Sequence, residues 1–258
     1  TDSELRFETK DEKIAIRSGK SRFLLATQTA TDFPSIGTFE SFVDFELPAS
    51  TLKALLEGTQ FAMAHQDVRY YLNGLLFELS EDNIRSVATD GHRLALCNRA
   101  APIGQTETRQ IIVPRKGVVE ISRMIGDSDE KVTITIGANH MQVTTARQSL
   151  TTKLVDGRFP DYERVIPRAG EKNVFADREL LRAGLARASI LSNEKFRGVR
   201  VALSKNQLTA IAHNPEQEEA EEEIEVEYDG EALEIGFNVS YLLDVLSVLD
   251  CAKVQVDF

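Results

Sequence analysis

A length of 258 residues is too long for one ordinary domain and suggests about two. The composition, 42% apolar and 28% charged, excludes a disordered chain, and no run of roughly 18 apolar residues indicates a membrane span. The formal charge of -11 argues against nucleic acid as a partner, but residues 216–229 hold nine acids and no base, so the remaining 30 bases and 32 acids nearly balance.

Four amphipathic helices are predicted in chain order, at residues 51–64, 114–126, 177–190 and 238–250. Residues of the types that cap or open helices stand at their starts: Ser50, Pro114, Asp177 and Asn238. Strands with a period of two are predicted at residues 131–137 and 223–229, and tight turns at 73–74 and 229–230. Such strands are typical of antiparallel sheets, one face of which the helices would cover.

An internal repeat is visible at a spacing of about 124 residues. Two segments match without a gap, 74–90 with 198–214 and 111–125 with 235–249. Two more match after small shifts, 50–61 with 179–190 and 23–34 with 149–160. Four matches in the same order predict an α+β chain of repeated domains, each with two helices and antiparallel sheets.

The phase of the repeat predicts where the copies begin and end. Residues 1–44 would be the C-terminal part of a first copy, 45–170 a complete second copy, and 171–258 the N-terminal part of a third.

The predicted helices are less acidic than the rest of the chain. Residues 114–126 carry +2 and 177–190 carry +1, whereas 51–64 are neutral and 238–250 carry -2. Helices that share one surface could therefore face phosphate groups in a protein that is acidic elsewhere. Lysines and arginines that are simply solvated on helix faces are the alternative interpretation.

Three polar strings carry the remaining signals. Residues 89–96 (TDGHRLAL) hold an acid near a histidine, but without a nucleophile motif they predict a turn beside a partner groove. Residues 153–167 (KLVDGRFPDYERVIP) are typical of an inter-domain linker, yet their apolar and aromatic content predicts packing or a sticky groove. Residues 64–74 (AHQDVRYYLNG) predict a loop with half-buried rings or, alternatively, one that contacts a nucleic-acid backbone.

No cofactor, metal site or catalytic residue is predicted. The four histidines lack metal-ligand spacing, and residues 216–229 lack a calcium-loop pattern, which favours a solvated edge strand there. Two cysteines, Cys97 and Cys251, cannot form a disulfide framework or a four-ligand zinc site. Together with an N-terminus that has no apolar signal segment, they predict a cytoplasmic location.

Seven strings, taken together and in this order, resemble the bacterial DNA polymerase III β sliding clamp family, most closely its proteobacterial members. They are HQDVRYYLNG, VATDGHRLAL, VPRKGV, KLVDGRFPDYERV, ILSNEKFRGVR, HNPEQEEAEE and IGFNVSYLLDVL. The resemblance implies a non-catalytic subunit of the replicative polymerase holoenzyme, with three similar domains, that dimerises head to tail into a ring around duplex DNA. It also implies a chain truncated at both ends relative to the family.

The resemblance further implies three sets of functional residues. A groove for short Gln-x-x-Leu/Phe motifs of the replicative polymerase, clamp loader, translesion polymerases and mismatch-repair proteins maps onto Leu72, Thr89, Gly91, His92, Arg93, Leu94, Pro160, Arg164, Val165, Asn238 and Tyr241. Sequence-independent contacts to double-stranded DNA map onto Gln66, Arg69, Tyr70, Tyr71, Arg115 and Lys116. The homodimer interface maps onto Phe23 and Leu25 on one side and Ile190 and Leu191 on the other.

Two functions remain open on the residues alone. A processivity clamp predicts basic helix positions in every copy, a feature that is clear in 114–126 and 177–190 and weak in 238–250. A protein-binding scaffold of repeated α+β domains that never encircles DNA is the alternative. An enzyme is a distant third, because no nucleophile or metal site is assembled.

Overall fold

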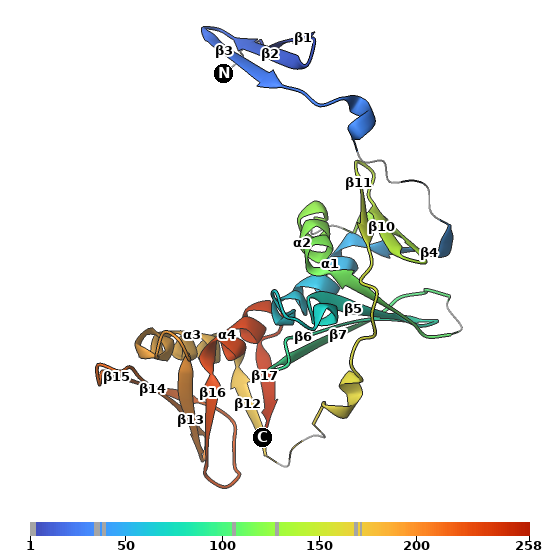
Figure 1. Cartoon of the computed structure of the whole chain (residues 1–258). Coiled ribbons are helices and arrows are strands. Elements are labelled where there is room, and N and C mark those ends of the chain that lie inside the picture. Colours follow the sequence, from blue (N-terminus) through green and yellow to red (C-terminus); the bar gives the residue numbers. More distant parts are fainter. Residues whose placement is uncertain are drawn as a thin grey trace. The chain divides into compact units, whose positions relative to one another are not determined.

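The structure is a computed structural model, and it describes residues 4–33, 37, 40–104, 107–126, 129–167, 170 and 172–258 (Figure 1). Internal contacts divide the chain into two units, Thr1–Glu40 and Ser41–Phe258, called unit 1 and unit 2 below. Among the residues placed in these ranges, no helix is long and apolar enough to cross a membrane.

Unit 1 is a three-stranded antiparallel meander with the order β1-β2-β3. Its elements are β1 (Arg6–Lys10), β2 (Lys13–Ser18), β3 (Ser21–Ala26) and the short 3-10 turn η1 (Ala30–Asp32). Every residue of β3 is exposed, including Phe23, Leu24 and Leu25. An apolar edge strand open to solvent is a surface that another chain can cover.

The first half of unit 2 contains two four-stranded antiparallel sheets, two helices and three 3-10 turns. The elements are β4 (Ser41–Pro48), α1 (Ala49–Glu57), η2 (Gln60–Ala62), η3 (Tyr70–Leu72), β5 (Gly74–Leu79), β6 (Asn83–Thr89), β7 (Leu94–Ala100), β8 (Arg109–Pro114), α2 (Arg115–Met124), β9 (Lys131–Gly137), β10 (His140–Thr144), β11 (Ser149–Lys153) and η4 (Tyr162–Arg164). The sheets have the orders β7-β6-β5-β8 and β11-β10-β9-β4.

The second half of unit 2 has the same kind of elements. They are β12 (Asn173–Asp177), α3 (Arg178–Ala188), η5 (Ser189–Leu191), β13 (Gly198–Ser204), β14 (Gln207–His213), β15 (Glu219–Glu225), β16 (Leu233–Asn238), α4 (Val239–Val248) and β17 (Lys253–Asp257). One sheet has the order β15-β14-β13-β16, and β12 pairs with β17. The strand β15, which lies within the acidic residues 216–229, is at the edge of this sheet, and an edge strand was predicted there.

The two halves repeat one topology, which confirms the internal repeat. The sheet order β7-β6-β5-β8 of the first half corresponds to β15-β14-β13-β16 in the second. In each half a helix follows the last of these strands along the chain, α2 after β8 and α4 after β16. Even the strand register returns, because Leu76 pairs with Val87 in the first half and Arg200 with Ile211 at the matching positions of the second. The predicted α+β class of repeated domains is confirmed.

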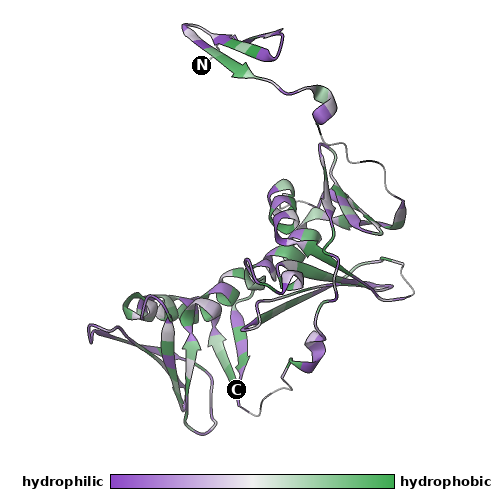
Figure 2. Cartoon of the chain, viewed as in Figure 1, coloured by the Kyte–Doolittle hydropathy of each residue, from purple (hydrophilic) through white to green (hydrophobic). Residues whose placement is uncertain are grey.

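Each half has its own core between its helices and the facing side of its sheets. In the first half, Leu55 of α1 and Ile121 of α2 share a buried cluster with Phe77 of β5. In the second half, Leu185 of α3 packs in the same way with Val201 of β13. Figure 2 shows the hydrophobic residues along these helices and strands, whereas the β15 hairpin is mostly hydrophilic.

Two predicted helix caps are confirmed by hydrogen bonds. The Asp177 carboxylate accepts from the backbone N–H of Leu180 at 2.9 Å, and the Asn238 side chain accepts from that of Ser240 at 2.9 Å. Each side chain satisfies one of the free N–H groups at its helix start.

The predicted starts of the other two helices are wrong by one or two residues. Ser50 lies inside α1, and the first N–H of that helix, at Ala49, donates to the carbonyl of Glu130 at 2.8 Å. A backbone partner from the approach to β9 thus replaces the side-chain cap. Pro114 ends β8 and stands before the first helical residue, Arg115.

Three other local predictions differ from the structure. The helix predicted at 51–64 ends at Glu57, and η2 follows it. The Asn-Gly pair at 73–74 makes no hairpin but joins η3 to β5. The strand predicted at 223–229 is shifted, because β15 ends at Glu225 and the Asp-Gly pair lies in the connection to β16.

Candidate functional site

The sheet β7-β6-β5-β8 has a second apolar side, which faces away from α1 and α2. Its central residues are Leu76, Val87 and Ile112, all buried. We call this side the outer face. This side is covered by η3, through Leu72, and by the segment 154–167.

The segment 154–167 crosses the outer face. The backbone N–H of Val155 donates to the carbonyl of Ile112 at 2.9 Å, and Phe159 and Tyr162 are 5% and 4% exposed within the same apolar cluster as Val87. Figure 1 shows the segment in yellow after β11. The packing that its aromatic residues predicted is therefore confirmed.

Several residues of the predicted groove meet at this cluster. Leu72 is buried in it, and Leu94 packs against it. On the segment itself, Pro160 and Arg164 are exposed and Val165 is 68% exposed. The structure thus places apolar positions of the sheet beside an exposed apolar and basic stretch of the segment.

The turn between β6 and β7 is tightly built around Asp90. The Asp90 carboxylate accepts hydrogen bonds from the backbone N–H groups of His92, at 2.9 Å, and Arg93, at 3.0 Å. The Thr89 hydroxyl donates to the carbonyl of Arg93 at 2.6 Å. Gly91 adopts φ +90°, a left-handed conformation that favours glycine, and the His92 side chain stays exposed.

Arg93 joins this turn to the second half of unit 2. Its guanidinium pairs with Asp244 at 2.5 Å, donates to the carbonyl of Phe61 at 2.8 Å and lies over the Tyr241 ring at 4.5 Å. Its Nε contacts Asp90 at 3.2 Å. Three of its N–H groups thus bind within the chain, and its contact with the Tyr241 ring holds that side chain in place.

The residues predicted to contact DNA differ in their exposure and in their contacts within the chain. Gln66 is exposed at a positive φ of 58°, and Tyr70 is exposed against the half-buried Tyr71. Arg69 is bound to Asp67 through its Nη2 at 2.8 Å and its Nε at 3.0 Å.

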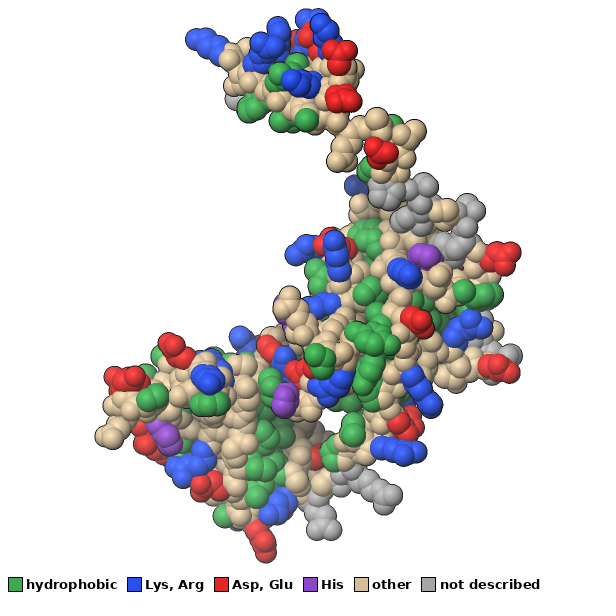
Figure 3. Space-filling model, viewed as in Figure 1, with side chains coloured by type: hydrophobic (Ala, Val, Ile, Leu, Met, Phe, Trp, Pro, Cys, Tyr) green, Lys and Arg blue, Asp and Glu red, His purple; other side chains and the backbone are tan. Residues whose placement is uncertain are grey.

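The two predicted basic residues of α2 have different surroundings. Arg115 donates to the carbonyl of Met63 at 3.2 Å and is half-buried, whereas Lys116 is exposed. On the face shown in Figure 3, both basic and acidic side chains lie on the surface of the described part of the chain.

The predicted interface residues are mostly exposed. Phe23 and Leu25 are exposed on β3, the edge strand of unit 1. Ile190 is 75% exposed on η5, and Leu191 beside it is half-buried. Exposed apolar side chains of this size are typical of surfaces that another chain covers.

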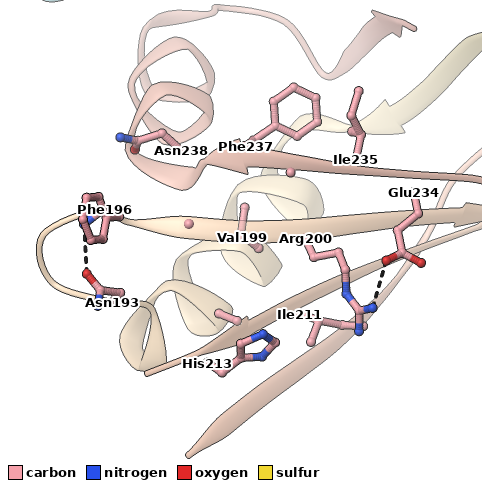
Figure 4. Close-up of a pocket in the computed structure, with 13 residues that line it drawn as sticks. Asn193, Phe196, Val199, Arg200, Ile211, His213, Glu234, Ile235, Phe237 and Asn238 are labelled. Carbon is pink, nitrogen blue, oxygen red and sulfur yellow. Dashed lines mark hydrogen bonds and ion pairs between the residues drawn. The ribbon is translucent and has the colours of Figure 1, made fainter. Parts of the chain in front are cut away.

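The matching face in the second half of unit 2 is open to solvent, with Phe196 67% and Ile235 38% exposed. Phe196, Ile211 and Ile235 line a pocket of about 560 Å³ there, and the ion pair between Arg200 and Glu234, at 2.9 Å, crosses it (Figure 4). Because Ile211 occupies the repeat position of Val87, the two faces can be compared residue by residue.

Sequence reasoning missed a polar network under the segment 154–167. Arg85 donates to the Tyr162 hydroxyl at 2.9 Å, and that hydroxyl lies 3.3 Å from a carboxylate oxygen of Glu78. The periodicity of β5 and β6 places Glu78 and Arg85 on the outer face, but nothing local in the sequence points to Tyr162 as their partner. In the ranges that the structure describes, no group of three His, Cys, Asp or Glu side chains could hold a metal ion.

Two family models match the chain. The model of the DNA polymerase III beta subunit, central domain, matches residues 46–161, and that of the C-terminal domain matches residues 163–258. The beta sliding clamp of Escherichia coli (strain K12) is 52% identical over 255 residues, which are 98% of this chain and 69% of the relative. The Pseudomonas putida beta sliding clamp is 51% identical over 255 residues, 99% of this chain and 70% of the relative.

Solved structures agree with these matches. A crystal structure of the DNA polymerase III subunit beta from Pseudomonas aeruginosa has a TM-score of 0.92 at 50% identity, over 100% of this chain and 71% of that one. A crystal structure of the C. crescentus beta sliding clamp has a TM-score of 0.89 at 36% identity, over 99% of this chain and 70% of that one.

The resemblance found in the sequence is thus confirmed over nearly the whole chain, which spans about 70% of the length of these relatives. The same matches confirm the prediction of a non-catalytic replication subunit. The chain belongs to the family of bacterial beta sliding clamps, the beta subunits of DNA polymerase III.

Proposed function

We propose that this chain acts as a processivity clamp that forms a head-to-tail homodimeric ring around duplex DNA and tethers partner proteins through a groove on the outer face. The proposal assigns residues 1–44, 45–170 and 171–258 to three successive clamp domains. Such a clamp stays on DNA because the ring is closed, so tight binding to the duplex is unnecessary.

The observation that carries the proposal is the apolar surface where the segment 154–167 meets the turn after β6. Leu94 packs against the cluster that Phe159 joins, and Val165, three residues after Tyr162 of that cluster, is 68% exposed. His92 and Arg164 are exposed, and the proposal assigns them the polar contacts to a bound peptide. A small apolar surface with a few polar contacts suits a short Gln-x-x-Leu/Phe motif of a polymerase, clamp loader or repair protein.

The proposed DNA contacts are few and weak, which suits a sliding protein. Gln66 and Tyr70 are exposed on one loop, and Lys116 is exposed on α2. Arg69 already has a carboxylate partner, so its charge is largely neutralised toward phosphate. Sequence-independent contacts of this kind position a duplex without holding it tightly.

The proposed dimer interface pairs two strand edges of opposite character. The strand β3 is an apolar edge strand that contains the exposed Arg22. The exposed Arg17 lies on the neighbouring strand β2. The strand β15 is an edge whose exposed positions are acidic, including Glu219 and Glu223. Pairing β3 of one copy with β15 of another is heterologous, and a ring requires that the rotation between the two copies closes on itself.

A peptide titration tests the groove. A fluorescently labelled peptide with a Gln-x-x-Leu/Phe motif should bind this chain, and His92→Ala and Arg164→Ala should each weaken binding about five- to tenfold with an unchanged fold. His213→Ala and Arg200→Ala are matched controls, because both residues are exposed on the sheet of the second half. Unaltered affinity in both groove variants would rule out the assignment.

A further inference from the structure

The segment 154–167 is held on the outer face by two aromatic side chains of different kinds. The Phe159 ring is buried among apolar residues, and the Tyr162 ring is buried in the same cluster with its hydroxyl in the polar network. Pro160 lies between the two, and Arg164 and Val165 follow directly. Every segment residue assigned to the groove is therefore within three residues of Tyr162.

The Tyr162 hydroxyl is placed between two charged groups of the sheet. Arg85 Nη1 donates to it at 2.9 Å and also lies 3.4 Å from a carboxylate oxygen of Glu78. The two Glu78 oxygens lie 3.3 and 3.4 Å from the hydroxyl, and Gln110 donates to one of them at 2.8 Å. Glu163 adds a second carboxylate 3.5 Å from Arg85.

Burial makes this network sensitive to the loss of one member. Burial raises the pKa of Tyr162, so the phenol stays protonated, and the hydrogen bond that Arg85 donates to the Tyr162 hydroxyl is the largest cause of the raised pKa of Arg85. The Nε of Arg85 is buried with no partner in the described structure, so the guanidinium depends on its remaining contacts. Removal of one partner from such a group leaves the others unsatisfied.

The internal repeat shows that the network is specific to one face. The strand registers place Ala202 at the position of Glu78 and Thr209 at that of Arg85. The second face therefore has neither the acid nor the arginine at these two positions, and its own ion pair, Arg200 with Glu234, stands at other positions. A network needed only to build the fold would be expected in both copies. We therefore connect the network of Glu78, Arg85 and Tyr162 with the segment 154–167 and the groove.

We propose that Tyr162, held by Arg85 and Glu78, is a positioning residue for the groove, because it fixes where Pro160, Arg164 and Val165 stand relative to Leu94 and His92. The inference rests on the proposed function. The carbonyl of Tyr162 accepts from the N–H of Val165 at 3.1 Å, so the position of the ring passes directly to the exposed end of the segment.

The test compares Tyr162→Phe with Tyr228→Phe. Tyr228 is a matched control, because it is 3% exposed and its hydroxyl donates to the carbonyl of Glu231 at 2.5 Å in the second half. We expect Tyr162→Phe to weaken the labelled Gln-x-x-Leu/Phe peptide about five- to tenfold and Tyr228→Phe to leave its affinity unchanged. Equal affinities for the two variants would overturn the proposal.

A double-variant cycle separates positioning from general destabilisation. If Tyr162 acts through the segment, Tyr162→Phe should weaken the peptide less than about twofold once Arg164→Ala is present. Fully additive effects would overturn the proposal. Hydrogen exchange at the Val165 amide should be faster in Tyr162→Phe than in Tyr228→Phe, and this readout needs no peptide.

The outcomes also separate this inference from the proposed function. Loss of affinity in His92→Ala and Arg164→Ala with none in Tyr162→Phe would overturn only the role of Tyr162. No loss in any of the three would overturn the groove assignment and, with it, the role of Tyr162, whatever the exchange rate at Val165. Glu78→Gln provides a second variant with the same expected direction if Tyr162→Phe fails to fold.

Discussion

Arg93 and Asp244 form a 2.5 Å ion pair that joins the first half of unit 2 to the second. Arg93 lies in the turn after β6 with 19% of its side chain exposed, and Asp244 lies on α4, one helical turn from Tyr241. Because the guanidinium also lies over the Tyr241 ring, one side chain fixes where α4 meets the groove.

We expect unequal costs when the two partners of this pair are changed. Arg93→Ala should lower the free energy of unfolding by about 2–4 kcal/mol, because it removes the pair, the stacking over Tyr241 and the hydrogen bond to Phe61. Asp244→Asn should cost at most about 1 kcal/mol, because Asp244 is 43% exposed. Urea unfolding followed by circular dichroism measures both, and equal costs would contradict the central role of Arg93.

A pH titration checks the contact between Asp67 and Arg69. Hydrogen bonds from the side chain and backbone of Arg69 lower the pKa of Asp67 from 3.8 to about 2. Since the folded pKa is below the unfolded value, the contact stabilises the loop above the unfolded pKa, and this contribution is lost as the pH falls through about 2.

NMR of the Asp67 carboxyl carbon should therefore give a titration midpoint near pH 2. Arg69→Gln should raise the pKa of Asp67 back toward 3.8. A midpoint that is the same in both proteins would show that Arg69 does not hold the carboxylate.

Gly91 tests the turn beside the groove. A Cβ at this residue would lie 3.1 Å from Arg69 Nη1, and its φ of +90° is strained for other residues. We expect Gly91→Ala to destabilise the protein by about 1–3 kcal/mol and to weaken peptide binding. Gly104→Ala is the control, because its φ is +71° with no atom within 4 Å of the new Cβ, and its peptide affinity should not change. A similar loss of affinity in both variants would contradict the turn's role.

The proposed interface predicts how self-association responds to mutation and salt. Ile190→Ala combined with Leu191→Ala should weaken the dimer by roughly 4 kcal/mol. The monomer should stay folded with a small loss of unfolding free energy, because Ile190 is mostly exposed and Leu191 is half-buried.

Association should also weaken with salt, since β15 is acidic and Arg22 lies on β3. Light scattering over a dilution series measures this, with Leu180→Ala, an exposed apolar change on α3, as control. Dissociation of the double variant at the same concentration as the unchanged chain would contradict the assignment.

Much of the fold could be predicted because local patterns decide it. Residues 131–137 alternate strictly and form β9 with the predicted bounds, and Asp177 and Asn238 cap helices as their residue types indicate. The start of α1 could not be predicted, because its first N–H is satisfied by Glu130, a partner distant in the chain.

In the candidate site, too, the residues with a local signal could be predicted and the contacts between distant residues could not. The residues of the groove were named by resemblance, and their apolar character agrees with the cluster that Leu72 and Leu94 join. The network of Tyr162 with Glu78 was missed, because the two residues are 84 positions apart and meet only when the segment packs on the sheet. The contact of Arg93 with Asp244, 151 positions apart, was missed for the same reason.

The most direct measurement is backbone amide NMR of this chain during titration with a Gln-x-x-Leu/Phe peptide. A groove on the outer face predicts shifts at Leu72, Leu94 and Val165 with none at the pocket of the second half, for which Ile211 is the reporter. Shifts at Ile211 that leave Leu94 and Val165 unchanged would contradict the account and place peptide binding on the other face.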